Sequence, residues 1–140
     1  IIKLIHRYNW ALDEHLPGRL TDIFSPSITY ELCNAAGDQL TEKKGEGQLQ
    51  GYLVEYFGMF KVYLSQPRHI SSNTLLHLID ADTVQGKTTM VVTLQHSEFE
   101  TPVLDYTGEL RSEFEKSAGI WRFSKMTLIV DGPQLTLRAR

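Results

Sequence analysis

Four long runs of alternating apolar and polar residues fill the second half of the chain, and they constrain the fold more than any other feature. Such alternation is typical of strands that bury one face, and these runs are longer than the usual strand of about five or six residues. Long strands twist and coil, so the pattern predicts one curved antiparallel sheet from Arg68 to Val130. The runs and the turns between them are His69 to Ile79, a turn at Asp80-Ala81-Asp82, Gly86 to His96, Val103 to Phe114, a turn at Lys116 to Gly119, and Ile120 to Val130.

The first half of the chain has mainly helical periodicity. Apolar residues recur at helical spacing up to His15, where Pro17-Gly18 stops the run. Helices that precede a long antiparallel meander indicate an α+β fold, with three N-terminal helices packed on a strongly curved antiparallel sheet. The elements expected here are helices at Ile1 to His15, Arg19 to Phe24 and Gln48 to Leu64, a strand at Ile28 to Cys33, and a loop at Asn34 to Gly47.

Composition narrows the class of protein. The 140 residues fit one domain, which we assign to residues 1–132, with residues 133–140 as a C-terminal tail. The net charge of -3 and scattered Lys and Arg residues argue against a nucleic-acid partner. No apolar run reaches the roughly 20 residues that span a bilayer, so no membrane partner is expected. Cys33 is the only cysteine, which excludes an intrachain disulfide and suits a cytoplasmic location.

Several local motifs, taken with the order of elements, resemble the NTF2-like superfamily and in particular its SnoaL-like branch. The resemblance covers nearly the whole chain and implies a cone-shaped α+β domain that encloses a pocket. The matching motifs are Tyr8-Asn9-Trp10-Ala11-Leu12-Asp13, Leu20-Thr21-Asp22-Ile23-Phe24, Arg68-His69-Ile70-Ser71-Ser72-Asn73, Asp80-Ala81-Asp82-Thr83-Val84, Tyr106-Thr107-Gly108-Glu109-Leu110 and Gly119-Ile120-Trp121-Arg122-Phe123.

The resemblance also implies a catalytic triad. In dehydratase-like members, a Tyr and an Asp from the first helix meet a His from the sheet, and Tyr8, Asp13 and His69 are similar to those three. His69 would take a proton from a carbon beside a carbonyl, Asp13 would orient the imidazole, and Tyr8 would donate a hydrogen bond to the developing enolate oxygen. This chemistry needs no metal or organic cofactor. Spacing alone does not place Tyr8 and Asp13 on one helix face, because five residues correspond to a net rotation of about 140°.

Aromatic and polar side chains suggest the lining of the pocket. Strand alternation puts His69, Ser71 and Asn73 on one face, and buried polar groups of this kind need partners such as water or a ligand. Among the middle strands, Thr93, Gln95 and His96 are alternative further polar groups. The predicted pocket residues are Tyr30, Tyr56, Phe60, Asn73, His96, Tyr106 and Trp121, a set that favours a small apolar or aromatic ligand.

Three functions are compatible with these sequence features. The first is a cofactor-independent lyase or isomerase, of dehydratase or cyclase type, acting on a small cyclic or polyketide-like carbonyl compound. The alternatives are a non-catalytic ligand-binding protein and an oligomer-assembly subunit of the same fold. His-x-His and Glu-x-x-His patterns are absent from the sequence, so no metal site is expected. A homodimer is expected on the outer face of the sheet, where apolar residues recur: Ile70, Leu76, Leu78, Val91 and Leu110.

Overall fold

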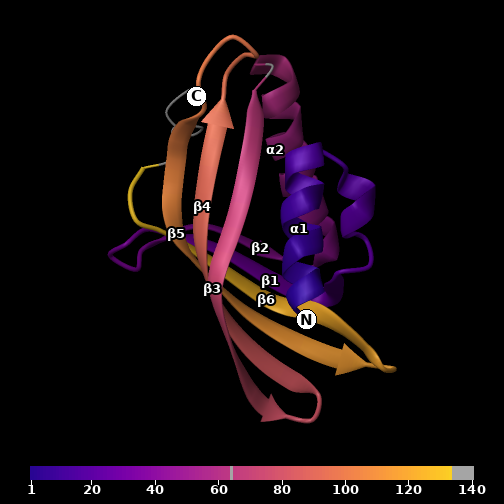
Figure 1. Cartoon of the computed structure of the whole chain (residues 1–140). Helices are drawn as coiled ribbons and strands as arrows, with labels where there is room; N and C mark the ends of the chain where they lie inside the picture. The colour runs from indigo at the N-terminus through magenta and orange to yellow at the C-terminus, as the bar shows by residue number, and fades with distance from the viewer. Residues whose placement is uncertain (64, 134–140) are drawn as a thin grey trace.

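The computed structural model describes residues 1–63 and 65–133, and Figure 1 shows its arrangement. Two α-helices and one short 3-10 helix are described, with six strands. The α+β class is confirmed, although two α-helices replace the expected three. The elements in chain order are α1 (Ile2–Glu14), η1 (Pro17–Leu20), β1 (Phe24–Cys33), β2 (Gln39–Lys44), α2 (Glu46–Tyr63), β3 (Gln66–Asp80), β4 (Thr83–Gln95), β5 (Val103–Ser117) and β6 (Ile120–Val130).

The missing helix was predicted over Arg19 to Phe24, and that prediction was wrong. Only the turn η1 forms there, and β1 already begins at Phe24. Phe24 pairs with Phe123 of β6, and the amide of Phe123 donates to the carbonyl of Ile23 at 2.8 Å. Pairing with the sheet therefore takes up residues that local periodicity assigned to a helix, as tertiary contacts often override local propensity.

All six strands form one sheet in the order β2-β1-β6-β5-β4-β3. The strands β3 to β6 pair consecutively and antiparallel, which confirms the predicted sheet from Arg68 to Val130. β1 joins β6 in parallel, and β2 pairs with β1. The expected loop from Asn34 to Gly47 therefore contains a strand, whose alternating but mostly exposed residues gave no apolar signal. β3 ends the sheet at one edge.

Both α-helices lie against the same face of the curved sheet (Figure 1). The core lies between the helices and the sheet. Both contribute apolar side chains to it, including Ile5 and Leu53 from the helices and Val92 and Phe123 from the sheet. The lower ends of β3 and β4 extend beyond the helices as a hairpin. This uncovered hairpin, defined as residues 72–87, carries exposed Leu75, Leu76, Leu78 and Ile79.

The prediction that Leu110 lies on the outer face of the sheet is wrong. It is buried and pairs with buried Thr88 of β4. Val91 is three residues further along β4 and pairs with Thr107, so its side chain lies on the opposite face of the sheet. Leu110 therefore belongs to the core and cannot contribute to an outer apolar face.

Leu76 and Leu78 are also not on the outer face: they pair with Gly86 and Val84, which lie on the same face of β4 as Thr88, and they are exposed only because no helix covers the hairpin. Ile70 and Val91 do share the outer face, where Ile70 is exposed and Val91 is half-buried.

Two further observations complete the fold. No helix in the described residues is long and apolar enough to cross a membrane. Of the predicted tail, residues 134–140 lie outside the described part of the chain.

Candidate active site

Helix α1 runs along the free edge of the sheet beside β3 (Figure 1). Four helical residues rise about 6 Å, and two strand residues rise about 6.6 Å. Positions four apart on α1 therefore meet alternate residues of β3: Asp13 contacts His69, and Asn9 contacts Ser71. The two elements run in opposite directions. Because the two rises are similar, Asp13–His69 and Asn9–Ser71 can both form along the same pair of elements.

The Asp13–His69 pair is the most tightly bonded of these contacts. His69 Nδ1 lies 2.6 Å from Asp13 Oδ1, and the backbone N–H of His69 donates to the same carboxylate at 2.9 and 3.2 Å. The two side chains are 3% and 7% exposed. One carboxylate therefore satisfies an amide of the edge strand and also orients the imidazole ring.

The end of α1 fixes where Asp13 lies. His15 adopts a left-handed conformation with φ of 56°, and this ends the helix one residue after Glu14. Gln66, the first residue of β3, donates its side-chain amide to the carbonyl of Asp13 at 2.9 Å. Asp13 is thus held through its backbone as well as its carboxylate.

The second ring nitrogen of His69 points toward α2. Its Nε2 lies 3.4 Å from the hydroxyl of Tyr56. An ionised carboxylate only accepts hydrogen bonds, so the short contact with Asp13 assigns the ring proton to Nδ1 in the neutral imidazole. Nε2 then carries a lone pair and can accept a proton, which is the property of a general base.

Tyr8, the third predicted member of the triad, is buried in the aromatic core. Its ring packs against Phe24 and Phe123 at centroid distances of 6.2 and 6.1 Å. Its described contacts are aromatic, and none joins it to Asp13 or His69. The structure therefore brings together two of the three predicted catalytic residues, and the hydroxyl beside His69 belongs to Tyr56.

Tyrosines gather inside the cone. Burial raises the pKa of Tyr8, Tyr30, Tyr56 and Tyr106, and the nearby phenols, Tyr52 among them, raise the values further because a second negative charge would be repelled. These phenols therefore stay protonated at ordinary pH and form a group of O–H donors around one interior region.

A groove of about 370 Å³ opens between α1 and β3, and both Asp13 and His69 line it. The remaining walls combine buried polar groups with exposed side chains, namely His6, Asn9, Trp10, Arg68, Ile70 and Ser71. Asn9 donates to Ser71 Oγ at 3.0 Å, while its own amide oxygen is buried without a partner. The groove is large enough for a small ligand.

The predicted pocket residues divide into two groups. Tyr30, Phe60 and Tyr106 are buried, while Tyr56 and Trp121 are half-buried against the core. Phe60 stacks on His15 and meets Tyr56 edge-on at 4.7 Å. His15 is consequently half-buried.

Asn73 and His96 were predicted to line the interior pocket, but both are exposed. Asn73 has φ of 54° and lies where the β3–β4 register shifts between Ser72 and Leu75. This bulge breaks the alternation that was expected to place Asn73 beside His69 and Ser71. His96 follows the last residue of β4 and so lies beyond the sheet.

Asn9 and Asp105 are among the buried polar residues that were not predicted from the sequence. Asn9 precedes Asp13 by one helical turn, so the i, i+4 spacing was the available signal. Asp105 is 4% exposed and sits beside Tyr106, where the β4–β5 register shifts between Val92 and Thr93. The bulge buries two consecutive residues, a departure from alternation that sequence does not reveal.

Metal chemistry receives no positive support from the site. Across residues 1–63 and 65–133, no three His, Cys, Asp or Glu side chains converge as metal ligands would. What the arrangement offers is a buried imidazole, a carboxylate bonded to it and several hydroxyl donors.

Comparisons with known proteins agree with this architecture. The sequence profile of the SnoaL-like domain matches residues 1–127. No curated protein matches the sequence significantly. Among solved structures, LinA shares 19% identity over 92% of this chain and 82% of its own, with a TM-score of 0.75.

Two further solved structures have the same fold. A scytalone dehydratase-like protein from Novosphingobium aromaticivorans has 15% identity and a TM-score of 0.76, covering 93% of this chain and 80% of its own. The protein Aln2 from a Streptomyces species has 20% identity and a TM-score of 0.75, covering 99% and 92%. Such identities establish the fold alone, whereas the profile match extends over most of the sequence. The chain belongs to the SnoaL-like domain family.

Proposed function

We propose that this protein is a cofactor-independent lyase or isomerase, in which His69 is the general base and Asp13 orients it. The observation that supports this most strongly is the buried pair itself, with 2.6 Å between Nδ1 and the carboxylate and Nε2 left as a proton acceptor. The names of two structural neighbours, hexachlorocyclohexane dehydrochlorinase and scytalone dehydratase, describe eliminations. A small cyclic or polyketide-like carbonyl compound is the proposed substrate.

The proposed reaction begins at a carbon next to a carbonyl. His69 Nε2 takes the proton, and the electron pair of the C–H bond forms a C=C bond as the carbonyl electrons move to oxygen. In an isomerisation, the substrate carries a C=C bond beside the acidic carbon, so the enolate is conjugated, and the imidazolium returns the proton to the far carbon as the C=O bond re-forms. In a dehydration, the C=O bond re-forms as the former C=C pair of the enolate shifts toward the β-carbon and breaks its C–O bond, and the departing β-hydroxyl takes the proton from the imidazolium as water. Asp13 stabilises the imidazolium in both cases.

Proton exchange at carbon tests this proposal without knowledge of the natural substrate. Wild-type protein in heavy water should accelerate the loss of the α-protons of cyclohexanone, followed by proton NMR. His69→Ala should abolish the acceleration, because the base is gone. His77→Ala is the matched control, since His77 is exposed on the same strand. Equal exchange rates for wild type and His69→Ala, or no acceleration by wild type, would contradict the proposal.

A non-catalytic ligand-binding role is the second candidate. It is favoured by one observation: the Tyr56 hydroxyl lies at Nε2, so the base is occupied in this structure. Binding of a small aromatic compound with no proton exchange for any carbonyl probe would support this role over the first.

We also propose a homodimer that uses the uncovered hairpin and the adjoining outer face of the sheet. Ile70 and Leu75, which share the outer face, are 51% and 72% exposed, and apolar patches of this kind commonly mark interfaces. Sedimentation at micromolar concentration should give a dimer mass for the wild type. A monomeric mass throughout this range would contradict the proposed homodimer.

A further inference from the structure

The hydroxyl of Tyr56 covers the base. It lies 3.4 Å from His69 Nε2, and the two rings meet edge-on with 6.4 Å between centroids. The His69 side chain is only 3% exposed. A ligand atom can therefore reach the lone pair of Nε2 only if Tyr56 moves aside.

Tyr56 is placed so that it can move while staying near the base. It stands on α2, where its ring packs edge-on against Phe60 at 4.7 Å and lies 6.2 Å from Phe57. The side chain is half-buried, so part of its surface has no protein neighbour. A phenol has few rotatable bonds, and a small rotation of the ring would shift the hydroxyl from Nε2 to an adjacent ligand atom.

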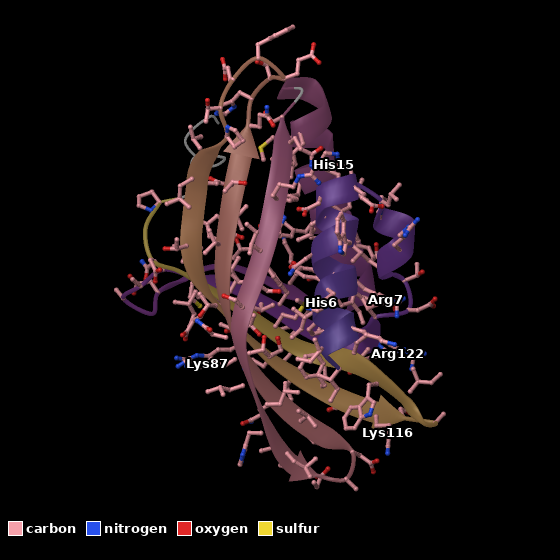
Figure 2. The ribbon with its side chains drawn as sticks, viewed as in Figure 1. His6, Arg7, His15, Lys87, Lys116 and Arg122 are labelled. Atoms are coloured by element: carbon pink, nitrogen blue, oxygen red, sulfur yellow. The ribbon has the colours of Figure 1, made fainter. Side chains whose placement is uncertain are left out.

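The electrostatic surroundings suit a proton donor. Among the described residues, no Lys or Arg is buried, and the labelled cations Lys87, Lys116 and Arg122 lie at the periphery of the sheet (Figure 2). Burial, Tyr106 and Asp105 raise the pKa of Tyr56 well above its usual value. A negative oxygen formed near His69 would therefore be stabilised by hydroxyl donors and not by a buried cation.

We propose that Tyr56 is a further catalytic residue, which covers His69 Nε2 in the free protein and donates its hydrogen bond to the ligand oxygen during the reaction. This inference rests on the proposed function of His69 and refines it. The ligand accepts the Tyr56 hydrogen bond, the lone pair of Nε2 becomes free, and the base then meets the C–H bond next to that oxygen-bearing carbon.

The arrangement defines a class of ligand. The molecule must present a hydrogen-bond-accepting oxygen on the carbon next to the one that carries the acidic proton, as in a ketone or an enone. As His69 removes that proton, negative charge moves onto the oxygen, and the Tyr56 O–H bond donates to it without transferring its own proton. A compound with no such oxygen would leave Tyr56 on Nε2 and the base covered.

Binding of para-nitrophenol tests the donor directly, because its phenolate oxygen resembles an enolate and its absorbance reports its environment. Tyr56→Phe should weaken binding by about ten- to a hundredfold, the usual effect of losing one hydrogen bond to a charged group. Tyr8→Phe removes the hydroxyl that the family resemblance implied, and it should weaken binding less than Tyr56→Phe, because no described contact joins Tyr8 to His69. His77→Ala, at an exposed position of the same strand as His69, is the control and should change the affinity by less than about twofold.

Each outcome decides the inference. Equal affinities for wild type and Tyr56→Phe, a larger loss in Tyr8→Phe, or no binding by wild type would overturn it. A second readout is the nitrogen NMR signal of His69 Nε2, which should move in Tyr56→Phe without ligand as its hydrogen bond disappears. If the phenol results hold but cyclohexanone shows no proton exchange, Tyr56 is the ligand donor of a binding protein, and the proposed reaction is the part that fails.

Discussion

The two halves of β3 differ sharply although they belong to one strand. From Gln66 to Ser71, α1 lies alongside, and His69 is buried with its amide and ring both bonded to Asp13. Beyond Asn73 the same strand passes into the uncovered hairpin, where Leu75 is 72% exposed. The bulge at Asn73 separates the halves.

This difference shows that coverage by α1, and not strand pattern, creates the site. Both halves alternate and both pair with β4. Only the first half lies beside α1, where residues four positions apart on the helix contact the strand. The polar residue Asp13 is then buried with a partner, whereas the hairpin is left with exposed apolar residues.

Alkaline pH should give the largest effect, because the buried phenols lie in the helix-covered part and residues 72–87 contain no tyrosine. The pKa values of Tyr8, Tyr30, Tyr56 and Tyr106 are raised in the folded state. Their stabilising contribution is complete below the unfolded pKa of about 10. Above that pH, a phenol ionises in the unfolded chain but stays protonated in the folded protein. Each such phenol then lowers the free energy of unfolding by about 1.4 kcal/mol per pH unit.

Denaturant unfolding between neutral pH and pH of about 11 measures this loss. Tyr30→Phe should lose less stability over that range than wild type, because one titrating phenol has been removed. A free energy of unfolding that does not change over this range would show that these phenols ionise without cost in the folded protein.

Asp13→Ala should lower the free energy of unfolding by about 1–3 kcal/mol for each buried donor that it leaves unpaired, the first of which is the Nδ1–H group of the neutral His69 ring. The amide of His69 would also lose its acceptor. Asp22→Ala, at an exposed position of the same N-terminal region, should stay within about 0.5 kcal/mol of wild type. Comparable losses in the two variants would mean that the Asp13 contacts contribute little to stability.

Ser71→Ala should have an intermediate effect. It removes the acceptor of the Asn9 amide, which is already missing one partner at its oxygen. A buried donor left unpaired costs about 1–3 kcal/mol. Ser72→Ala is the matched control, since Ser72 is exposed and its substitution should be nearly neutral. If chemical denaturation gives the same stability for both variants, the α1–β3 contact at Ser71 is dispensable.

Leu75→Ser should have the smallest effect on the folded monomer, within about 0.5 kcal/mol, because the side chain is mostly exposed. The same substitution should weaken the proposed homodimer. Urea unfolding of dilute protein and sedimentation of concentrated protein separate the two effects. A large loss of stability in dilute protein would show that Leu75 packs within its own chain.

Much of the fold was predictable because it depends on periodic patterns. The alternation from Arg68 to Val130 gave four strands, and the helical spacing gave α1 and α2. β2 was missed since its residues are mostly exposed, and the helix at Arg19 to Phe24 was wrong since pairing with β6 overrides local periodicity. Register is a long-range property, so the exposure of Asn73 and the burial of Leu110 could not be derived from alternation.

The site was predictable in part. Family resemblance brought Asp13 and His69 into one hypothesis, and the structure places them in contact. Tyr56 was predicted only as a pocket residue, because the distance of its hydroxyl from Nε2 depends on how α2 crosses the sheet. Asp105 was missed because only a bulge buries it next to Tyr106.

Nitrogen NMR of the His69 ring tests the central claim most directly, since the claim is that Asp13 holds the proton on Nδ1 and leaves Nε2 as a base. At neutral pH the account predicts a protonated Nδ1 and an unprotonated Nε2, with Asp13→Asn disturbing this preference. A neutral ring protonated at Nε2 would contradict the account, because that nitrogen would then have no lone pair with which to accept a proton.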